Sequence, residues 1–180
     1  VSHAFLLIAG LIAAMMLFIW LSRRVIERAA SDVVDSNTGG SVLSALKSRW
    51  ATFGAIVIGL YVGAEVSIGS IMINFLNQRD VLNLPLETAG FYLGNVYWMG
   101  ALVGRFIGSF LLTRIPAPRL LAIAAAVAGA LCLTVALTSG PMAAVAALAV
   151  GLFNSIMFPT IFTITLERAG VSQSSTSGLL

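Results

Sequence analysis

The chain has 180 residues, of which 59% are hydrophobic and only 9% are charged, and its formal net charge is +3. A soluble domain carries about 25% charged residues, which keep its surface hydrated, so this composition excludes an ordinary soluble globule. Nucleic-acid binding is not expected either, because no basic patch is interleaved with aromatic residues. Since one helix needs roughly 20 apolar residues to cross a bilayer, the long apolar runs predict an all-α, polytopic transmembrane bundle.

Five apolar segments have the length of transmembrane helices, and they cover about residues 4–22, 51–76, 89–112, 120–138 and 141–166. Pro116 and Pro118 keep the third and fourth segments from merging, and Gly140-Pro141 predicts a tight turn before the fifth. The chain begins at Val1 instead of a methionine, and a new apolar run starts at its other end. We therefore expect part of a longer protein, with about five transmembrane helices and the start of another.

The connection between the first two segments is much longer than the others. Antiparallel neighbouring helices need only short loops, so a long polar connection predicts a boundary between two bundles. We assign residues 1–22 to the last helix of one bundle, residues 23–50 to the linker, and residues 51–180 to the opening helices of a second bundle. Within the linker, residues around 25–34 and 42–50 have the pattern of amphipathic helices on the membrane surface.

The basic residues predict the orientation of the chain. Nine of its ten lysines and arginines fall in or beside the connections 23–50 and 113–119 and the segment after the fifth span, whereas the connection 77–88 holds only Arg79. Lysine and arginine are enriched in cytoplasmic loops. We therefore expect the 23–50 linker to lie in the cytoplasm, the N-terminus to lie outside, and the protein to reside in the inner membrane.

Glu65 is the most informative residue, because it lies near the middle of the second apolar segment. A charged group at that depth costs about 2.5–3.5 kcal/mol even on insertion scales, so Glu65 should face a cavity or a partner. Tyr61 lies one helical turn away on the same face. An acid beside an aromatic ring can bond a polyol or carry a proton, and the alternative is a protonated glutamate bonded to a neighbouring helix.

Two asparagines in apolar segments are further candidates for substrate contact. Asn95 offers an amide to sugar hydroxyls and Trp98 a flat ring to the C–H face of a sugar; the alternative is an interhelical hydrogen bond of about 0.6 kcal/mol. Asn154 precedes Pro159, which removes a backbone hydrogen bond and kinks the helix. Kinked helices recur where transporters bind substrate or bend, but neighbouring helices can also satisfy the freed backbone groups.

Arg105 lies about eight residues from the cytoplasmic end of the third segment, which is roughly 12 Å of helix. Its long side chain can reach part of the way to the membrane surface, so we expect it to anchor the helix or form a gate. The alternative is contact with the substrate or with Glu65. In the same segment, Gly100, Gly104 and Gly108 are spaced by four residues, which favours close packing of helices.

Several kinds of site are missing from the sequence. It contains no GxxxxGK[ST] loop, no HExxH and no GxSxG motif. Its single cysteine, Cys132, lies in an apolar run and has no partner for a disulfide. We therefore expect neither an enzyme nor a resident metal or organic cofactor.

Three stretches carry a family resemblance: YVGAEVSIGS at 61–70, GRFIG at 104–108 and NSIMFPTIF at 154–162. They resemble the major facilitator superfamily, within the fucose:proton symporter family that includes glucose/galactose transporters. The resemblance covers nearly the whole chain. It implies twelve helices in two six-helix bundles, of which this chain would supply helices 6 to 10 and the beginning of helix 11.

The resemblance also implies an activity, which is the inward transport of a monosaccharide by alternating access, with the proton as coupling ion. The implied partners are the sugar, the lipid bilayer and the N-terminal bundle of the same protein, which would hold most of the acidic residues important for coupling. In this chain, Thr113-Arg114 stands where the superfamily's loop motif has Asp-Arg. The alternatives are transport of another solute, such as drug efflux, or a non-transporting membrane sensor or assembly subunit.

The site predictions that result are of two kinds. The predicted substrate contacts are Glu65, Tyr61, Asn95, Trp98 and Asn154. The predicted gate or structural residues are Arg105, Arg114 and Pro159.

Overall fold

The computed structural model describes residues 2–31 and 42–180, and every regular element in these two ranges is a helix. The chain divides into two compact units, Val1–Gly40 and Ser41–Leu180. The described part of the first unit is the single helix α1 (Ser2–Ser31). It extends beyond the predicted end at Ser22, because the arginines, glutamate and alanines that follow are good helix formers. Residues 32–41 of the predicted linker lie outside the described residues.

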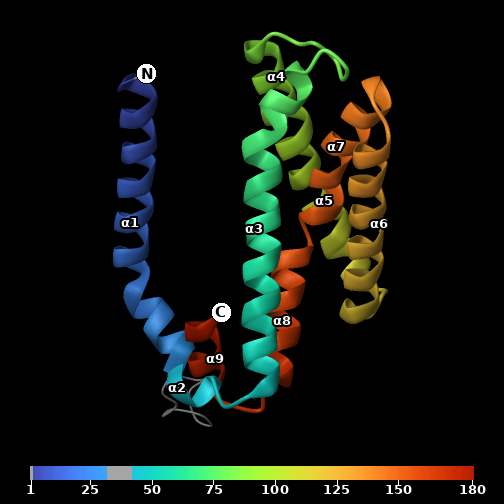
Figure 1. Cartoon of the computed structure of the whole chain (residues 1–180). Coiled ribbons are helices and arrows are strands. Elements are labelled where there is room, and N and C mark those ends of the chain that lie inside the picture. The colour runs from blue at the N-terminus through green and yellow to red at the C-terminus, as the bar shows by residue number, and fades with distance from the viewer. Residues whose placement is uncertain (1, 32–41) are drawn as a thin grey trace. The chain divides into compact units, whose positions relative to one another are not determined.

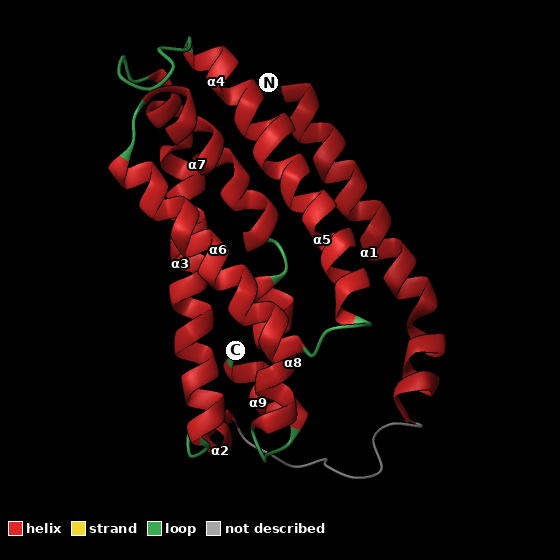
Figure 2. Cartoon of the chain, turned by 90° about the vertical axis from the view of Figure 1, so that its right-hand side faces the viewer, coloured by secondary structure: helices red, strands yellow, loops and turns green. Residues whose placement is uncertain are grey.

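The second unit holds all the other helices, which Figures 1 and 2 show in two views. In chain order these are α2 (Val42–Ala45), α3 (Arg49–Asn77), α4 (Leu86–Tyr92), the π-helical segment η1 (Leu93–Trp98), α5 (Met99–Leu112), α6 (Ala117–Leu137), α7 (Gly140–Asn154), α8 (Met157–Arg168) and α9 (Gln173–Leu179). The elements α4, η1 and α5 follow one another without a loop. They form the third predicted segment, with a π-helical stretch that the sequence pattern does not predict.

Four helical stretches of the described residues are long and apolar enough to cross a membrane: Phe5–Arg23, Arg49–Asn77, Ala117–Leu137 and Gly140–Arg168. They confirm the first, second, fourth and fifth predicted segments. The third corresponds to the continuous run from α4 to α5. The short helix α9 follows where the sequence predicts the start of a further helix.

Helix α7 lies at the centre of the second unit, with buried residues on nearly every turn. Helices α5 and α6 pack against α7, while α3 packs along α8. The contact with α5 is close because Gly104 lies directly against the Leu152 carbonyl and the Ser155 hydroxyl, where a Cβ would collide. Gly108 lies equally close to Ile156. The predicted close packing of the glycines in α5 is thus confirmed.

Hydrogen bonds tie α3 to the fifth segment at both ends of the bundle. The Ser48 hydroxyl donates to the Ala169 carbonyl at 2.6 Å, just past the end of α8, and the same oxygen caps α3 by accepting from the backbone N–H of Ala51. At the opposite end, the Gly140 N–H donates to the Asp80 carbonyl at 2.8 Å. Helix α3 therefore runs alongside both α7 and α8 and is fixed to each.

Candidate functional site

The fifth segment is interrupted in its middle. Helix α7 ends at Asn154 and α8 begins at Met157. Pro159 has no N–H to bond the carbonyl of Ser155, four residues earlier. The Ser155 hydroxyl donates to the Leu152 carbonyl, one of the last carbonyls of α7, at 2.8 Å. The predicted kink is thus confirmed, and it is a break between two helices.

Tyr61 satisfies one of the backbone groups at this break. Its hydroxyl donates to the Asn154 carbonyl at 2.8 Å, across from α3 to the end of α7. The last four carbonyls of any helix lack partners within that helix, so Tyr61 caps the end of α7 from a neighbouring element. The tyrosine is 7% exposed, and its ring lies 6.3 Å from that of Phe158 in α8. Tyr61, a predicted substrate contact, thus has a definite structural role.

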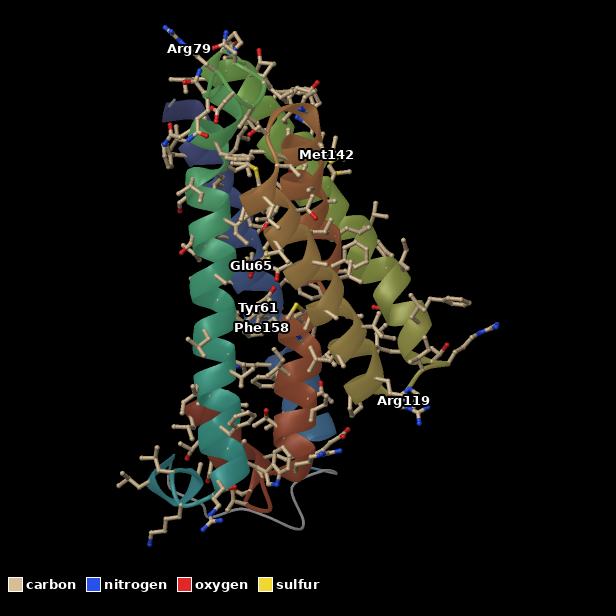
Figure 3. The ribbon with its side chains drawn as sticks, turned by 45° about the vertical axis from the view of Figure 1, so that its right-hand side comes forward. Tyr61, Glu65, Arg79, Arg119, Met142 and Phe158 are labelled. Atoms are coloured by element: carbon tan, nitrogen blue, oxygen red, sulfur yellow. The ribbon has the colours of Figure 1, made fainter. Side chains whose placement is uncertain are left out.

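Glu65 lies one turn from Tyr61 on α3 and is partly buried. Figure 3 shows Glu65, Tyr61 and Phe158 together about midway along the bundle, between Arg79 at one end and Arg119 at the other. The carboxyl group interacts electrostatically with both Tyr61 and Tyr97. Within the described parts of the chain, no lysine or arginine forms an ion pair with it. Glu65 therefore has two phenol side chains near it and no ion-pair partner in this part of the chain.

Tyr97 is a site residue that the sequence analysis missed. It lies on η1, is 1% exposed, and its hydroxyl is buried without a hydrogen-bond partner in the described part of the chain. The amide nitrogen Nδ2 of Asn154, which is 7% exposed, is unpartnered in the same way. The two side chains are neighbours. Each unsatisfied buried group costs about 1–3 kcal/mol, so this pair is a costly feature that needs an explanation.

The available signal for Tyr97 was a hydroxyl-bearing ring inside an apolar segment. In an α-helix with 3.6 residues per turn, Trp98 lies on the same face as Asn95, whereas Tyr97 does not. The π-helical geometry of η1 changes that period. Tyr97 therefore faces α7, with its carbonyl oxygen 2.6 Å from where a Cβ at Gly151 would lie.

Trp98 lies beside the cluster, whereas Asn95 does not join it. The Trp98 indole packs edge-on against the Tyr97 ring, with centroids 5.2 Å apart, and it lies over Gly69, one turn beyond Glu65. Asn95 is exposed, and its Nδ2 donates to the Phe91 carbonyl of its own helix at 3.1 Å. The predicted substrate contact of Asn95 stays a prediction that this geometry does not strengthen.

The two predicted gate arginines lie away from the centre of the cluster. Arg105 is exposed on α5 and makes no ion pair with Glu65, although its charge reaches Tyr61. Arg114 follows the end of α5, where its guanidinium lies 5.2 Å from the centre of the Phe110 ring. Their predicted roles in a gate stay predictions.

The arrangement brings together a carboxyl group, an amide and two phenols at mid-depth, next to a helix break and a π-helical segment. These features define a polytopic helical membrane protein with a polar cluster enclosed in its apolar bundle. The chain belongs to the Major Facilitator Superfamily, whose sequence model matches residues 2–180.

Individual relatives are similar along most of this chain. A "Glucose/galactose transporter" of Brucella abortus biovar 1 (strain 9-941) is 45% identical over 137 residues, which cover 76% of this chain and 33% of the relative. The "L-fucose-proton symporter" of Escherichia coli (strain K12) is 33% identical over 126 residues, 68% of this chain and 27% of that protein. This chain thus spans about a third of the length of the curated relatives it matches.

Solved structures give the same likeness. A crystal structure of the E. coli fucose:proton symporter FucP superposes with a TM-score of 0.68 and 28% identity, covering 77% of this chain and 33% of that one. A second FucP structure, in the outward conformation, superposes with a TM-score of 0.67 and 29% identity over the same shares. The helical membrane fold predicted from the sequence is therefore confirmed.

Proposed function

We propose that the full-length protein is a secondary active transporter that carries a monosaccharide of the glucose, galactose or fucose type across the inner membrane, in symport with protons. The main support is the cluster of Tyr61, Glu65 and Asn154 at mid-depth, because an ionisable residue inside a membrane segment commonly marks a substrate or proton pathway. The substrate class and the coupling ion are those of the similar glucose/galactose transporter and L-fucose-proton symporter.

The mechanism we propose is alternating access around this cluster. The Glu65 carboxylate accepts hydrogen bonds from sugar hydroxyls or takes up the proton, and Trp98 offers an apolar face to the sugar ring. The break between α7 and α8 is the bending point, because a discontinuous helix changes angle without losing its internal hydrogen bonds. Asn154 lies at the bending point and also belongs to the proposed binding cluster.

The orientation and division of the chain are part of the same proposal. Residues 1–22 form the last helix of an N-terminal bundle, residues 23–50 form the cytoplasmic linker, and residues 51–180 open the C-terminal bundle, with the N-terminus of this chain outside. The distribution of basic residues supports this orientation, since Arg79 and Arg119 lie at opposite ends of the bundle (Figure 3). Arg105 and Arg114 then lie toward the cytoplasm, as gate residues would.

The variant Glu65→Gln in the full-length protein tests the proposal. Uptake of labelled D-glucose, D-galactose and L-fucose is measured in proteoliposomes, with and without an imposed pH gradient. We expect uptake to fall at least tenfold, because a hydrogen bond to a charged group contributes about 1.5–3 kcal/mol and about 1.4 kcal/mol is tenfold. If Glu65 carries the proton, the remaining uptake also loses its response to the gradient.

Glu87→Gln is the matched control, because it removes an exposed carboxyl group from the first turn of α4 and should leave uptake unchanged. Unchanged uptake and unchanged gradient dependence in Glu65→Gln would exclude both roles of Glu65. If the parent protein moves none of the three sugars, the proposed substrate class is wrong, and transport of another solute or a non-transporting role replaces it.

A further inference from the structure

We propose that Tyr97 and Asn154 form a specificity-determining pair that recognises one hydroxyl group of the transported ligand. The inference rests on the proposed function for the class of ligand, a monosaccharide. Its own observation is the presence of two polar atoms, Oη of Tyr97 and Nδ2 of Asn154, that are neighbours, are enclosed, and have no hydrogen-bond partner in the described residues.

The backbone around both side chains is held in place. On η1, the Tyr97 carbonyl and ring lie against Gly151, where a Cβ would come within 2.6 Å of the carbonyl oxygen. On α7, the Asn154 carbonyl accepts the hydrogen bond of Tyr61 at 2.8 Å. The hydroxyl and the amide are neighbours on these two elements, and neither has a hydrogen-bond partner of good geometry among the described residues.

A single hydroxyl oxygen satisfies both atoms at once. The Asn154 amide nitrogen is only a donor, whereas a phenol both donates and accepts. A ligand hydroxyl therefore accepts from Nδ2 and exchanges a hydrogen bond with Oη. The pair takes an uncharged hydroxyl and leaves charged interactions to Glu65.

The position of the pair explains how a ligand reaches it. Trp98 is 45% exposed and packs edge-on against Tyr97, so it forms the outer side of the site. Asn154 is the last residue of α7, directly before the break. Bending at the break changes the surroundings of Asn154 while the hydrogen bonds within α7 stay intact, and this opens the pair to the ligand.

Such a pair sets specificity more than it sets affinity. A site built to hydrogen-bond a substrate hydroxyl rejects an analogue that lacks it, because buried polar groups are then left unpaired. The pair should therefore decide which hydroxyl position, or which epimer, the protein accepts.

The test removes the Tyr97 hydroxyl and, separately, each hydroxyl of the sugar, and it compares the effects of the two kinds of removal. Full-length protein and its Tyr97→Phe variant are reconstituted, and D-galactose, D-glucose and their monodeoxy analogues compete with a labelled parent sugar. In the parent protein, one analogue should compete at least tenfold worse than its sugar, which corresponds to about 1.4 kcal/mol. In Tyr97→Phe, that penalty should shrink to threefold or less, while the penalties of the other analogues stay unchanged.

Two further variants complete the experiment. Asn154→Leu removes the amide at similar size and should shrink the penalty of the same analogue. Tyr92→Phe removes an exposed hydroxyl from α4 and should leave every penalty as it was.

Three results would overturn the inference. The first is a loss shared equally by all analogues in Tyr97→Phe, as expected if the pair holds only a water molecule. The second is no change in any penalty. The third is that Tyr97→Phe and Asn154→Leu act on different hydroxyls. In each case the parent protein still transports sugar, so the proposed function survives; it fails only if no sugar competes in the parent protein, and the inference then falls with it.

Discussion

Helix α6 and the α7–α8 pair are both long and apolar enough to cross a membrane, yet only one of them is interrupted. Helix α6 is a single helix of 21 residues. In its most apolar stretch, 11% is buried within the protein, whereas in the most apolar stretch of Gly140–Arg168 the buried share is 56%. A helix that faces lipid must satisfy its backbone groups internally. A helix enclosed by protein can break, because neighbours such as Tyr61 supply the missing hydrogen bonds. The polar cluster therefore lies where the protein, and not the lipid, surrounds the backbone.

The largest expected effect comes from filling the contact that encloses the break. Gly104→Leu places a side chain against the Leu152 carbonyl and the Ser155 hydroxyl. Overpacking costs about 1–3 kcal/mol and occasionally more, and here the obstacle is backbone, so we expect the upper end of that range and loss of transport. The readouts are the apparent melting temperature of the full-length protein in detergent and sugar uptake.

Gly129→Leu on α6 is the control for this prediction, since no heavy atom lies within 4 Å of where its Cβ would be. If both variants destabilise the protein equally, the close contact at Gly104 is no more sensitive to a larger side chain than the open position on α6, and the prediction is wrong.

A smaller effect is expected when the missing backbone donor is restored. Pro159→Ala returns an N–H that can bond the Ser155 carbonyl, and it therefore favours a continuous helix across the break. We expect the melting temperature to stay the same or rise while the transport rate falls, since the bending point stiffens. Parallel measurements of melting and of initial uptake rate check this.

Pro118→Ala is the matched control, because Pro118 also lies in the first turn of its helix, but α6 follows a turn and has no helix directly before it to join. A faster rate in Pro159→Ala would contradict the role of the break as a bending point.

The smallest effect concerns the hydrogen bond across the break. Tyr61→Phe leaves the Asn154 carbonyl without its donor, and a buried hydrogen bond of this kind contributes about 0.5–1.5 kcal/mol. The apparent melting temperature of the full-length protein should fall by a few degrees. Tyr92→Phe, which removes an exposed hydroxyl, should not change it, and equal melting of the two variants would mean that Tyr61 does not stabilise the break.

Hydropathy predicts the membrane segments well because the bilayer acts on the average of about 20 residues, and local errors cancel. Glu65 and Asn154 could be found because each is a polar residue inside an otherwise apolar run. Pro159 predicts the break because proline lacks a backbone N–H in any context. These features need no knowledge of which helices are neighbours.

Tyr97 and the end of α1 escaped prediction for different physical reasons. The facing direction of Tyr97 depends on the π-helical turn, which the hydropathy pattern does not mark, and in the fold Tyr97 packs closely against Gly151. The helix α1 continues to Ser31 because hydropathy marks where the lipid should end, while helix propensity extends further. Asn95 belongs to the predicted site by its residue chemistry; its amide bonds the carbonyl of Phe91, four residues earlier in the same helical run, and its contact with substrate stays a prediction.

Helix α3 bridges the break between α7 and α8, because hydrogen bonds connect it and its flanking residues to both of these helices. The turn after α3 is bonded to the start of α7 through Asp80 and Gly140. The N-cap residue Ser48 is bonded to Ala169, just past the end of α8, and Tyr61 on α3 is bonded to the last residue of α7. A rotation of α8 against α7 would have to carry α3 with it or break at least one of these bonds. The three bonds thus link the break in the fifth segment to both ends of α3, and Glu65 lies one turn from the bond at the break.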